Sequence, residues 1–244
     1  TSSDYLRIIQ LAKLKDITLE QQYNLKEHTQ DVSVQKLKNL SSELESYKKA
    51  HGLIDYNDMI LDFIKSDASP EFDVVFIDEA QDLSLMQWNM AKSIWNKTED
   101  SYIAGDDDQA IFRWAGADVD SFIAQTGKFL KLTESHRVPR VVHDVAMKIV
   151  KRISKRHHKE WKPKNKNGAL SYYHNFQDID MSSGEWYVLA RTRHMLTKLE
   201  NVLSSKGLYY RNKFKKDYEK DLHEAIIDWE KWRKNNDLNH DQIK

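Results

Sequence analysis

Hydrophobic and polar positions divide the chain into a helical first part and a later part in which strands and helices alternate. From Asp4 to Ile64 the apolar residues recur at helical spacing with almost no strand pattern, which predicts amphipathic helices. Gly52 is expected to end one of them, because glycine readily adopts the left-handed conformation that closes a helix. We therefore interpret residues 1–66 as a helical subdomain or insertion.

The alternating part begins with an apolar run that stops abruptly at acidic residues. Residues 72–77 are mostly valine, phenylalanine and isoleucine, and such a run predicts a buried strand of a parallel sheet that is covered on both faces. A helix is predicted over 84–96 and a second strand over 101–104. The order strand, helix, strand is typical of a parallel α/β sheet.

Further elements continue this alternation. Strands are predicted at 129–132, 170–174, 186–190 and 208–210, and helices from Pro139 to about Ser154, over 192–205 and over 217–234. A second sheet-bearing unit is expected to begin near Leu132. The chain after the first helical part is accordingly divided into residues 67–131, 132–212 and 213–244, the last of which starts another helical insertion.

Acidic and amide side chains follow two of the predicted strands. Asp78 and Glu79 come directly after the first strand, and the loop Gly105–Gln109 follows the second. Because ligands of parallel sheets bind beyond the carboxyl ends of the strands, these side chains are expected to meet at one edge. Two adjacent acids there are suited to holding a divalent cation and to orienting a water molecule against a phosphate. The alternative is that the acids stay solvated and cap the next helix, a role that Asp82 fits well.

An aromatic and basic segment lies beside this predicted site, at residues 110–117. Trp114, next to Arg113, is a candidate for an exposed plate on which a nucleobase stacks. The alternative is a core residue, which is the commoner role of a tryptophan. Phe112 is expected to pack inward.

Two residues just ahead of the helix predicted from Pro139 are candidates for nucleotide contact. Arg137 stands just before the proline that starts the helix and is placed to sense a terminal phosphate, or else to pair with a carboxylate at the helix end. His136 is a candidate for stacking on a base, although a lone histidine is more often a satisfied surface or core group.

The charge is balanced overall but unevenly distributed. Lys and Arg total 38, as do Asp and Glu, yet residues 67–82 carry six acids and no Lys or Arg, whereas residues 148–166 carry nine Lys or Arg and one acid. A basic stretch and an acidic site are together compatible with a nucleic acid and a metal nucleotide. The commoner explanation of a charge run is a solvated helix face. Contact of the basic linker around residues 155–166 with a phosphate backbone is a second possibility.

The composition also excludes some classes of protein. The chain has no cysteine, which excludes disulfides and thiolate metal sites. No apolar run approaches membrane-spanning length and no signal-peptide pattern is present, so we expect a cytoplasmic protein. Thr1 in place of Met suggests a piece of a longer protein.

Three stretches together resemble helicase motifs II, III and IV of the UvrD/Rep family in superfamily I. They are Asp78–Asp82, Gly105–Ala117 and Leu132–Arg137, and the later Val188–Thr192 resembles the start of that family's second motor domain. The resemblance implies an α/β fold with RecA-like parallel sheets of the P-loop NTPase type and helical insertions, truncated in this chain. It also implies an ATP-driven 3′-to-5′ helicase and translocase that acts on single-stranded and duplex DNA.

The resemblance implies a role for each matching residue. Asp78 would bind magnesium, Glu79 would activate the attacking water, and Gln109 would link the γ-phosphate of ATP to the DNA site. His136, which stands where the family usually has tyrosine, would stack on adenine, and Arg137 would contact the γ-phosphate. The residues that would contact DNA are Arg113, Trp114, Arg191 and Thr192. Ala115 stands where the family often has arginine.

The chain contains no Gly-x-x-x-x-Gly-Lys-Ser/Thr pattern. That loop supplies the backbone amides and the lysine that cradle the β- and γ-phosphates. We therefore interpret the chain as the middle of a helicase, which by itself binds ATP poorly and hydrolyses it negligibly. The alternative is a non-catalytic module that binds single-stranded nucleic acid through a helicase-like fold.

Overall fold

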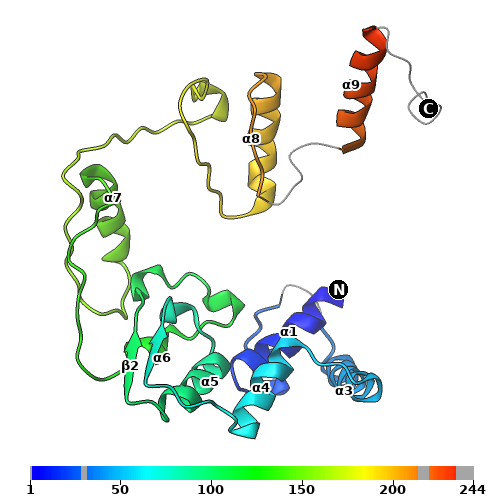
Figure 1. Ribbon diagram of the computed structural model, residues 1–244, viewed down its shortest axis with the longest axis vertical. Coiled ribbons are helices and arrows are strands. Elements are labelled where there is room, and N and C mark those ends of the chain that lie inside the picture. Colours follow the sequence, from blue (N-terminus) through cyan, green and yellow to red (C-terminus); the bar gives the residue numbers. More distant parts are fainter. Residues whose placement is uncertain (1, 29–31, 214–219, 235–244) are drawn as a thin grey trace. The chain divides into compact units, whose positions relative to one another are not determined.

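The computed structural model describes residues 2–28, 32–213 and 220–234 (Figure 1). The chain divides into two compact units, residues 1–169 and 170–244, which are described separately below. The fold is mixed α/β with a small parallel sheet, which confirms the predicted α/β class and the parallel direction of the strands. None of the helices in the described ranges combines the length and the apolar character that crossing a membrane requires.

The first part of the chain is helical, as its apolar periodicity predicts. Its helices are α1 (Ser2–Leu14), α2 (Leu19–Asn24), α3 (Val34–His51) and α4 (Tyr56–Ser66). Local sequence sets their ends: the Thr18, Ser33 and Asp55 side chains accept hydrogen bonds at the N-termini of α2, α3 and α4, which satisfies backbone donors that the helix leaves unpaired. Gly52 closes α3 with a φ of 63°, so that prediction is confirmed.

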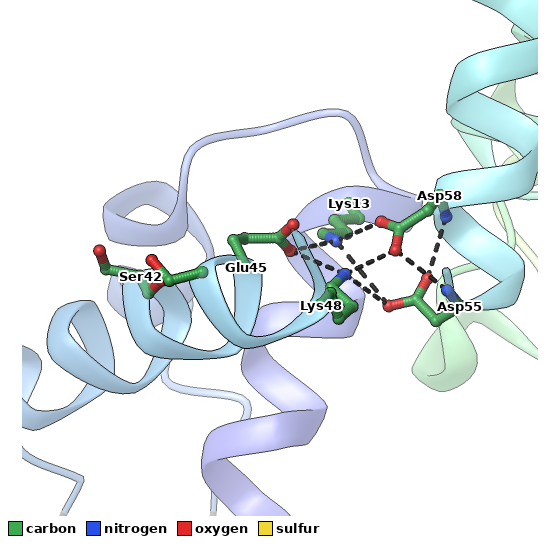
Figure 2. A network of polar contacts seen from close by, with 7 residues as sticks. Lys13, Ser42, Glu45, Lys48, Asp55 and Asp58 are labelled. Carbon is green, nitrogen blue, oxygen red and sulfur yellow. Dashed lines mark hydrogen bonds and ion pairs between the residues drawn. The ribbon is translucent and has the colours of Figure 1, made fainter. Parts of the chain in front are cut away.

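A polar network fastens α1, α3 and α4 together (Figure 2). The Lys48 ammonium donates to Asp58 Oδ2 at 2.6 Å and to Asp55 Oδ2 at 3.1 Å, and it lies 3.0 Å from Glu45 Oε1. Lys13 donates to Glu45 Oε1 at 2.7 Å and to Asp58 Oδ1 at 2.9 Å. Burial by itself would lower the pKa of Lys48, but hydrogen bonds to Asp58, Glu45 and Asp55 raise it well above its ordinary value. Lys48 is therefore held as a cation, and Lys13 contacts the same group of carboxylates.

The sheet consists of β1 (Val74–Ile77) and β2 (Asp100–Ile103), connected by α5 (Leu85–Trp95). The strands are parallel, with Val74 opposite Asp100 and Ile77 opposite Ile103, so the predicted strand, helix, strand unit is confirmed. Ser84 caps α5 in a reciprocal capping box with Gln87. Asp82, the residue that best fitted the capping alternative, is therefore not the cap of this helix.

Helix α5 supplies the best-buried side chain next to the sheet. Trp88 is 0% exposed, packs edge-on against Trp95, and donates from Nε1 to the Asp118 carbonyl oxygen at 3.3 Å. Figure 1 shows α5 beside α4 and α1. The helical first part is thus packed directly on the strand-bearing part.

The prediction that β1 is buried on both faces is wrong for this structure. Phe76 is 76% exposed and stacks on Tyr102 of β2 with ring centroids 5.0 Å apart. Among the described residues the sheet has only these two strands. An apolar run is buried on both faces only where further strands and helices cover it, and two strands with one connecting helix leave much of it in water.

Short elements and paired segments complete the first unit. They are the 3-10 turns η1 (Ala80–Asp82), η2 (Asp107–Gln109) and η3 (Arg113–Ala115), then α6 (Val119–Ile123) and α7 (Arg140–Val150). Residues 133–141 run beside residues 162–167, with Ser135 N donating to the Lys162 carbonyl oxygen at 2.8 Å and Lys162 N to the Thr133 carbonyl oxygen at 2.7 Å. This pairing brings the basic linker back along the segment that precedes α7.

The second unit contains η4 (Phe176–Asp178), α8 (Arg193–Ser205) and α9 (Lys220–Arg233). Helices α8 and α9 confirm the predicted helices, although residues 217–219 of the latter lie outside the described residues.

The strands predicted at 129–132, 170–174, 186–190 and 208–210 are not formed in either unit. A strand requires a neighbouring strand to which its backbone can hydrogen-bond, and these apolar runs have none in the described part. Leu132 and Leu189 are each 94% exposed.

Candidate functional site

The turn that follows β1 holds the two acids singled out in the sequence. Asp78 Oδ1 accepts the backbone N–H of Glu79 at 2.9 Å, and Glu79 has a left-handed φ of 52°. That conformation is uncommon for a residue with a side chain and clusters at functional turns. Both acids are exposed at the carboxyl end of the strand, where ligands of parallel sheets bind.

Gln81 connects the ends of the two strands. Its Nε2 donates to Glu79 Oε2 at 2.7 Å, and its Oε1 accepts the backbone N–H of Asp106 at 2.9 Å. The Ala80 N–H donates to the carbonyl oxygen of Ala104 at 3.0 Å beside this relay. The Gln81 side chain is almost fully buried, so its amide holds the Glu79 carboxylate against the second loop. No role was predicted for Gln81, although it lies within the stretch Asp78–Asp82 that resembles helicase motif II.

The second loop arrives beside the first, as the parallel pairing predicts. Gly105 approaches Gln81 so closely that a Cβ there would lie 2.6 Å from Gln81 Oε1 and 2.9 Å from the Phe122 ring, which explains the glycine. Gln109 Nε2 donates to Asp106 Oδ2 at 2.6 Å. Asp78, Glu79 and Gln109 are therefore carried by two adjacent, hydrogen-bonded turns.

Asp82, the last residue of η1, has a different environment from the exposed acids. Its Oδ1 is buried with no hydrogen-bond partner among the described residues. Burial and the neighbouring Glu79 carboxylate raise the pKa of Asp82. Both effects disfavour the charged form of Asp82, which distinguishes it from the exposed Asp78 and Glu79.

The basic linker is bound to the acidic loop, a contact that was not predicted from the sequence. Arg156 forms a two-pronged ion pair with Asp108, from Nε to Oδ1 at 2.6 Å and from Nη2 to Oδ2 at 2.7 Å. Lys159 pairs with Asp106 Oδ1 at 2.7 Å and also with Asp107. Contact of these two basic residues with a phosphate backbone is therefore not supported. The uneven charge distribution was the available signal, because an acidic loop and a basic run in one domain can neutralise each other.

The aromatic and basic segment beside the loop is exposed. Trp114 is 65% exposed, and Ile111 and Phe112 are also exposed, so the inward packing predicted for Phe112 is wrong. Arg113 pairs with Asp120 at 3.3 Å. The segment is anchored by Gly116, whose φ is 102° and whose added Cβ would lie 3.2 Å from Leu14 of α1. The first helical part therefore supports the turn that displays Trp114.

The other predicted site residues lie on separate segments. His136 and Arg137 are exposed just before α7, where Ser135 Oγ accepts the Arg137 and Val138 N–H groups at 3.3 and 3.0 Å. No hydrogen bond or ion pair joins Arg137 to the Asp78–Glu79 turn in the described part of the chain. In the second unit, Arg191 and Thr192 are exposed at the start of α8.

The chemistry available to the first turn follows from its carboxylates. The described residues contain no group of three or more His, Asp or Glu side chains arranged to hold a metal ion. Magnesium in phosphate sites commonly takes only one or two protein carboxylates and completes its shell with phosphate oxygens and water. Exposed Asp78 and Glu79 are therefore compatible with a magnesium ion that arrives with a phosphate ligand, and not with a metal ion enclosed by protein.

Comparison with known proteins gives a consistent set of matches. The family described as UvrD/REP helicase N-terminal domain matches residues 3–130. The ATP-dependent DNA helicase PcrA of Bacillus subtilis (strain 168) is 26% identical over 173 residues, which cover 65% of this chain and 23% of that protein. The probable DNA helicase II homolog of Mycoplasma capricolum is 24% identical over 157 residues, covering 62% of this chain and 21% of that protein.

A second PcrA sequence gives the same result over a shorter range. The protein of Staphylococcus epidermidis (strain ATCC 12228 / FDA PCI 1200) is 25% identical over 142 residues, covering 52% of this chain and 20% of its own length. The chain thus spans less than a quarter of the length of each of these relatives. The family match contains the Asp78–Glu79 turn, the Gly105–Gln109 loop and Trp114, but ends before His136.

Proposed function

Because the chain belongs to the UvrD/REP helicase N-terminal domain family, we propose that it provides part of the motor of an ATP-dependent DNA helicase. In this proposal residues 67–131 and 132–212 belong to two RecA-like motor domains, and residues 1–66 and 213–244 belong to helical insertions. The motor moves along single-stranded DNA in the 3′-to-5′ direction and opens duplex DNA. Its proposed location is the cytoplasm, in association with DNA.

The convergence of two strand ends is the observation that carries this proposal. The β1 turn and the β2 loop are joined by the relay from Glu79 through Gln81 to Asp106. An edge of this kind, with exposed carboxylates on one turn and an amide on the next, is suited to a nucleotide phosphate and its magnesium ion. Asp78 would hold the magnesium ion that accompanies ATP. When bound, ATP and magnesium supply the phosphoryl group and neutralise the charge that develops on it.

The residues of the chain have distinct proposed roles around that group. The Glu79 carboxylate, oriented by Gln81, takes a proton from the attacking water. Gln109, anchored on Asp106, connects the γ-phosphate with the DNA side. His136 stacks on adenine and Arg137 contacts the γ-phosphate, both from the turn that Ser135 stabilises.

DNA contact is proposed for four residues. Exposed Trp114 offers a ring face on which a base stacks, and Arg113 adds positive charge beside it. Arg191 and Thr192, exposed at the start of α8, are the other two residues proposed to contact DNA. The other proposed function, a non-catalytic module, keeps these DNA contacts but lacks hydrolysis.

The proposal is tested by Glu79→Gln in the longest protein that contains this chain. Glutamine keeps the shape of Glu79 but removes the carboxylate that accepts the proton, so DNA-stimulated ATP hydrolysis should fall about 10²- to 10⁴-fold. ATP affinity should stay within about threefold, because the change acts on the chemical step. Glu71→Gln, a matched change at an exposed acid before β1, should leave both quantities unchanged.

Two outcomes contradict the proposal. Unaltered hydrolysis in Glu79→Gln removes the proposed base. Absence of DNA-stimulated hydrolysis in the unsubstituted protein, with single-stranded DNA binding retained, favours the non-catalytic module.

A further inference from the structure

The basic segment Lys155–Lys159 lies against the loop that carries Gln109. Arg156 pairs in two-pronged fashion with Asp108, the His157 backbone N–H donates to Asp107 Oδ2 at 2.6 Å, and Lys159 pairs with Asp106 at 2.7 Å, with Asp107, and with Asp108 at 3.3 Å. These partners are about fifty positions apart in the sequence. The segment is therefore a tertiary support of the loop and not part of its local turn.

Burial makes this contact specific. The Asp108 side chain is 7% exposed and the Arg156 side chain 12% exposed, so each ion has lost most of its water and depends on its partner. A two-pronged arginine–carboxylate pair also fixes the relative orientation of the two groups, which a single point contact does not. Burial by itself would raise the pKa of Asp106, but hydrogen bonds from Lys159 and Gln109 lower it, so this carboxylate stays ionised between its two donors.

Asp106 transmits the contact to Gln109. Its Oδ2 accepts the Gln109 side-chain amide at 2.6 Å, while its Oδ1 lies 2.7 Å from Lys159 Nζ and accepts the Asp108 N–H at 3.1 Å. The two oxygens of one carboxylate therefore divide between Gln109 and the basic segment. Lys159 thus contacts the carboxylate that holds Gln109, and Arg156 contacts Asp108 of the same loop.

The same segment also reaches the Trp114 side of the site. Lys155 Nζ lies 2.7 Å from Asp120 Oδ1, and Asp120 accepts hydrogen bonds from Arg113 at 3.3 and 3.4 Å. One five-residue segment thus contacts the acids that hold Gln109 and the acid that holds Arg113. The segment therefore contacts both the loop that carries Gln109 and the acid that pairs with Arg113 beside Trp114.

We propose that Arg156 and Lys159 are positioning residues that hold the Asp106–Gln109 loop in the conformation from which Gln109 couples ATP hydrolysis to DNA. This inference rests on the proposed helicase function and adds two residues outside the region of the family match, residues 3–130. They touch neither nucleotide nor DNA and act through Asp106 and Asp108.

The test compares Arg156→Gln, Arg156→Lys and Lys151→Met in the longest protein that contains this chain. Arg156→Gln should lower the DNA-stimulated rate of ATP hydrolysis about tenfold or more, because a displaced loop misplaces the Gln109 amide. The KM for ATP and the affinity for single-stranded DNA should change less than about threefold, since neither ligand is contacted. Arg156→Lys keeps the charge without the fork and should recover part of the rate. Lys151, exposed in the same basic run, is the matched control and should have no effect.

A double-mutant cycle separates positioning from a general loss of folding. In a Gln109→Ala background, Arg156→Gln should reduce the DNA-stimulated rate by less than about twofold further, because residues that act through one group are not additive. A full additional tenfold loss in that background contradicts the proposal. Weakened DNA binding by Arg156→Gln with a reduced salt dependence also contradicts it, since that behaviour identifies a phosphate contact.

The failure of the wider proposal is distinguishable. If the unsubstituted protein lacks DNA-stimulated hydrolysis, the helicase function fails and this inference fails with it. If the unsubstituted protein hydrolyses ATP and folded Arg156→Gln and Arg156→Lys do so equally well, only the positioning role is rejected. If Arg156→Gln does not fold, Arg156→Lys alone decides: a rate equal to that of the unsubstituted protein rejects the role, and a lower rate with unchanged KM supports it.

Discussion

Replacing Lys48 by Met tests the polar network of Figure 2, which fastens the helical first part. The network contains two lysines, Lys13 and Lys48, and the three carboxylates Glu45, Asp55 and Asp58. Lys48 is 9% exposed and Asp58 15% exposed in their side chains. Removing Lys48 leaves one cation among three carboxylates in this partly buried place.

The size of the effect follows from what the carboxylates retain. Removing one partner of a buried ion pair costs about 3–5 kcal/mol, because the other charge stays buried without compensation. Asp58 keeps Lys13 at 2.9 Å, and Asp55 is 43% exposed to water. We therefore expect the lower end, a decrease of about 3 kcal/mol in the free energy of unfolding at pH 7. With a slope of about 2 kcal/mol per molar urea, the unfolding midpoint should fall by about 1.5 M.

The loss of unfolding free energy in Lys48→Met should also depend on pH, which tests the network independently. Burial by itself would raise the pKa of Asp58, but hydrogen bonds from the Asp55 N–H, Lys48 and Lys13 lower it well below its ordinary value. A carboxyl group with a lowered native pKa stabilises the fold above its unfolded pKa of about 3.9, and this contribution is lost as the pH falls toward the native pKa. The difference in unfolding free energy between Lys48→Met and the unsubstituted chain should therefore stay constant from pH 7 to about pH 5 and shrink as the pH is lowered further to 3.

Urea unfolding followed by far-ultraviolet circular dichroism measures both parts on the complete chain. Lys49→Met is the matched control, because Lys49 is an exposed neighbour on the same helix, and it should change the unfolding free energy by less than about 0.5 kcal/mol. A cost below about 1 kcal/mol for Lys48→Met at pH 7 contradicts the stabilising role of the network. A difference from the unsubstituted chain that is as large at pH 3 as at pH 7 contradicts it equally.

Two further substitutions test the core and the close approach at the site. Trp88→Ala should lower the free energy of unfolding in urea by about 3–5 kcal/mol, because Trp88 is fully buried. The control Trp114→Ala should lower it by less than about 0.5 kcal/mol and should weaken single-stranded DNA binding by about 1–3 kcal/mol. Equal unfolding costs for the two variants would contradict the assigned burial. Gly105→Ala should lower the free energy of unfolding by about 1–3 kcal/mol, because the added Cβ displaces the buried Gln81 amide oxygen from the Asp106 N–H. An unchanged urea midpoint would show that the second loop does not depend on the close contact between Gly105 and Gln81.

The contact between the basic segment Lys155–Lys159 and the Gln109 loop explains part of the uneven charge distribution. Arg156 and Lys159 neutralise Asp106, Asp107 and Asp108 inside the first unit. Basic charge that remains near the aromatic turn, such as Arg113, is itself shared with Asp120. DNA affinity on this side is therefore expected to depend more on stacking at Trp114 than on the number of basic residues.

The sequence by itself determined the features that depend on neighbouring residues. The N-termini of helices α2, α3, α4 and α5 are capped by Thr18, Ser33, Asp55 and Ser84. Such capping is local, because the side-chain oxygen accepts an N–H only three residues further along the chain. Gly52 ends α3 for an equally local reason. The meeting of the Asp78–Glu79 turn with the Gly105–Gln109 loop was also predictable, because a single connecting helix brings successive parallel strands side by side.

Only the tertiary structure decided which charges pair and which apolar runs become strands. The Arg156–Asp108 pair joins positions 48 residues apart, and a sequence of charges does not state whether a basic run faces water, DNA or an acidic loop. The runs at 129–132 and 186–190 have strand composition but lie exposed without a hydrogen-bonded neighbour in the described chain. A helix satisfies its backbone groups within one segment, whereas a strand and a long-range ion pair each require a partner that the local sequence does not contain.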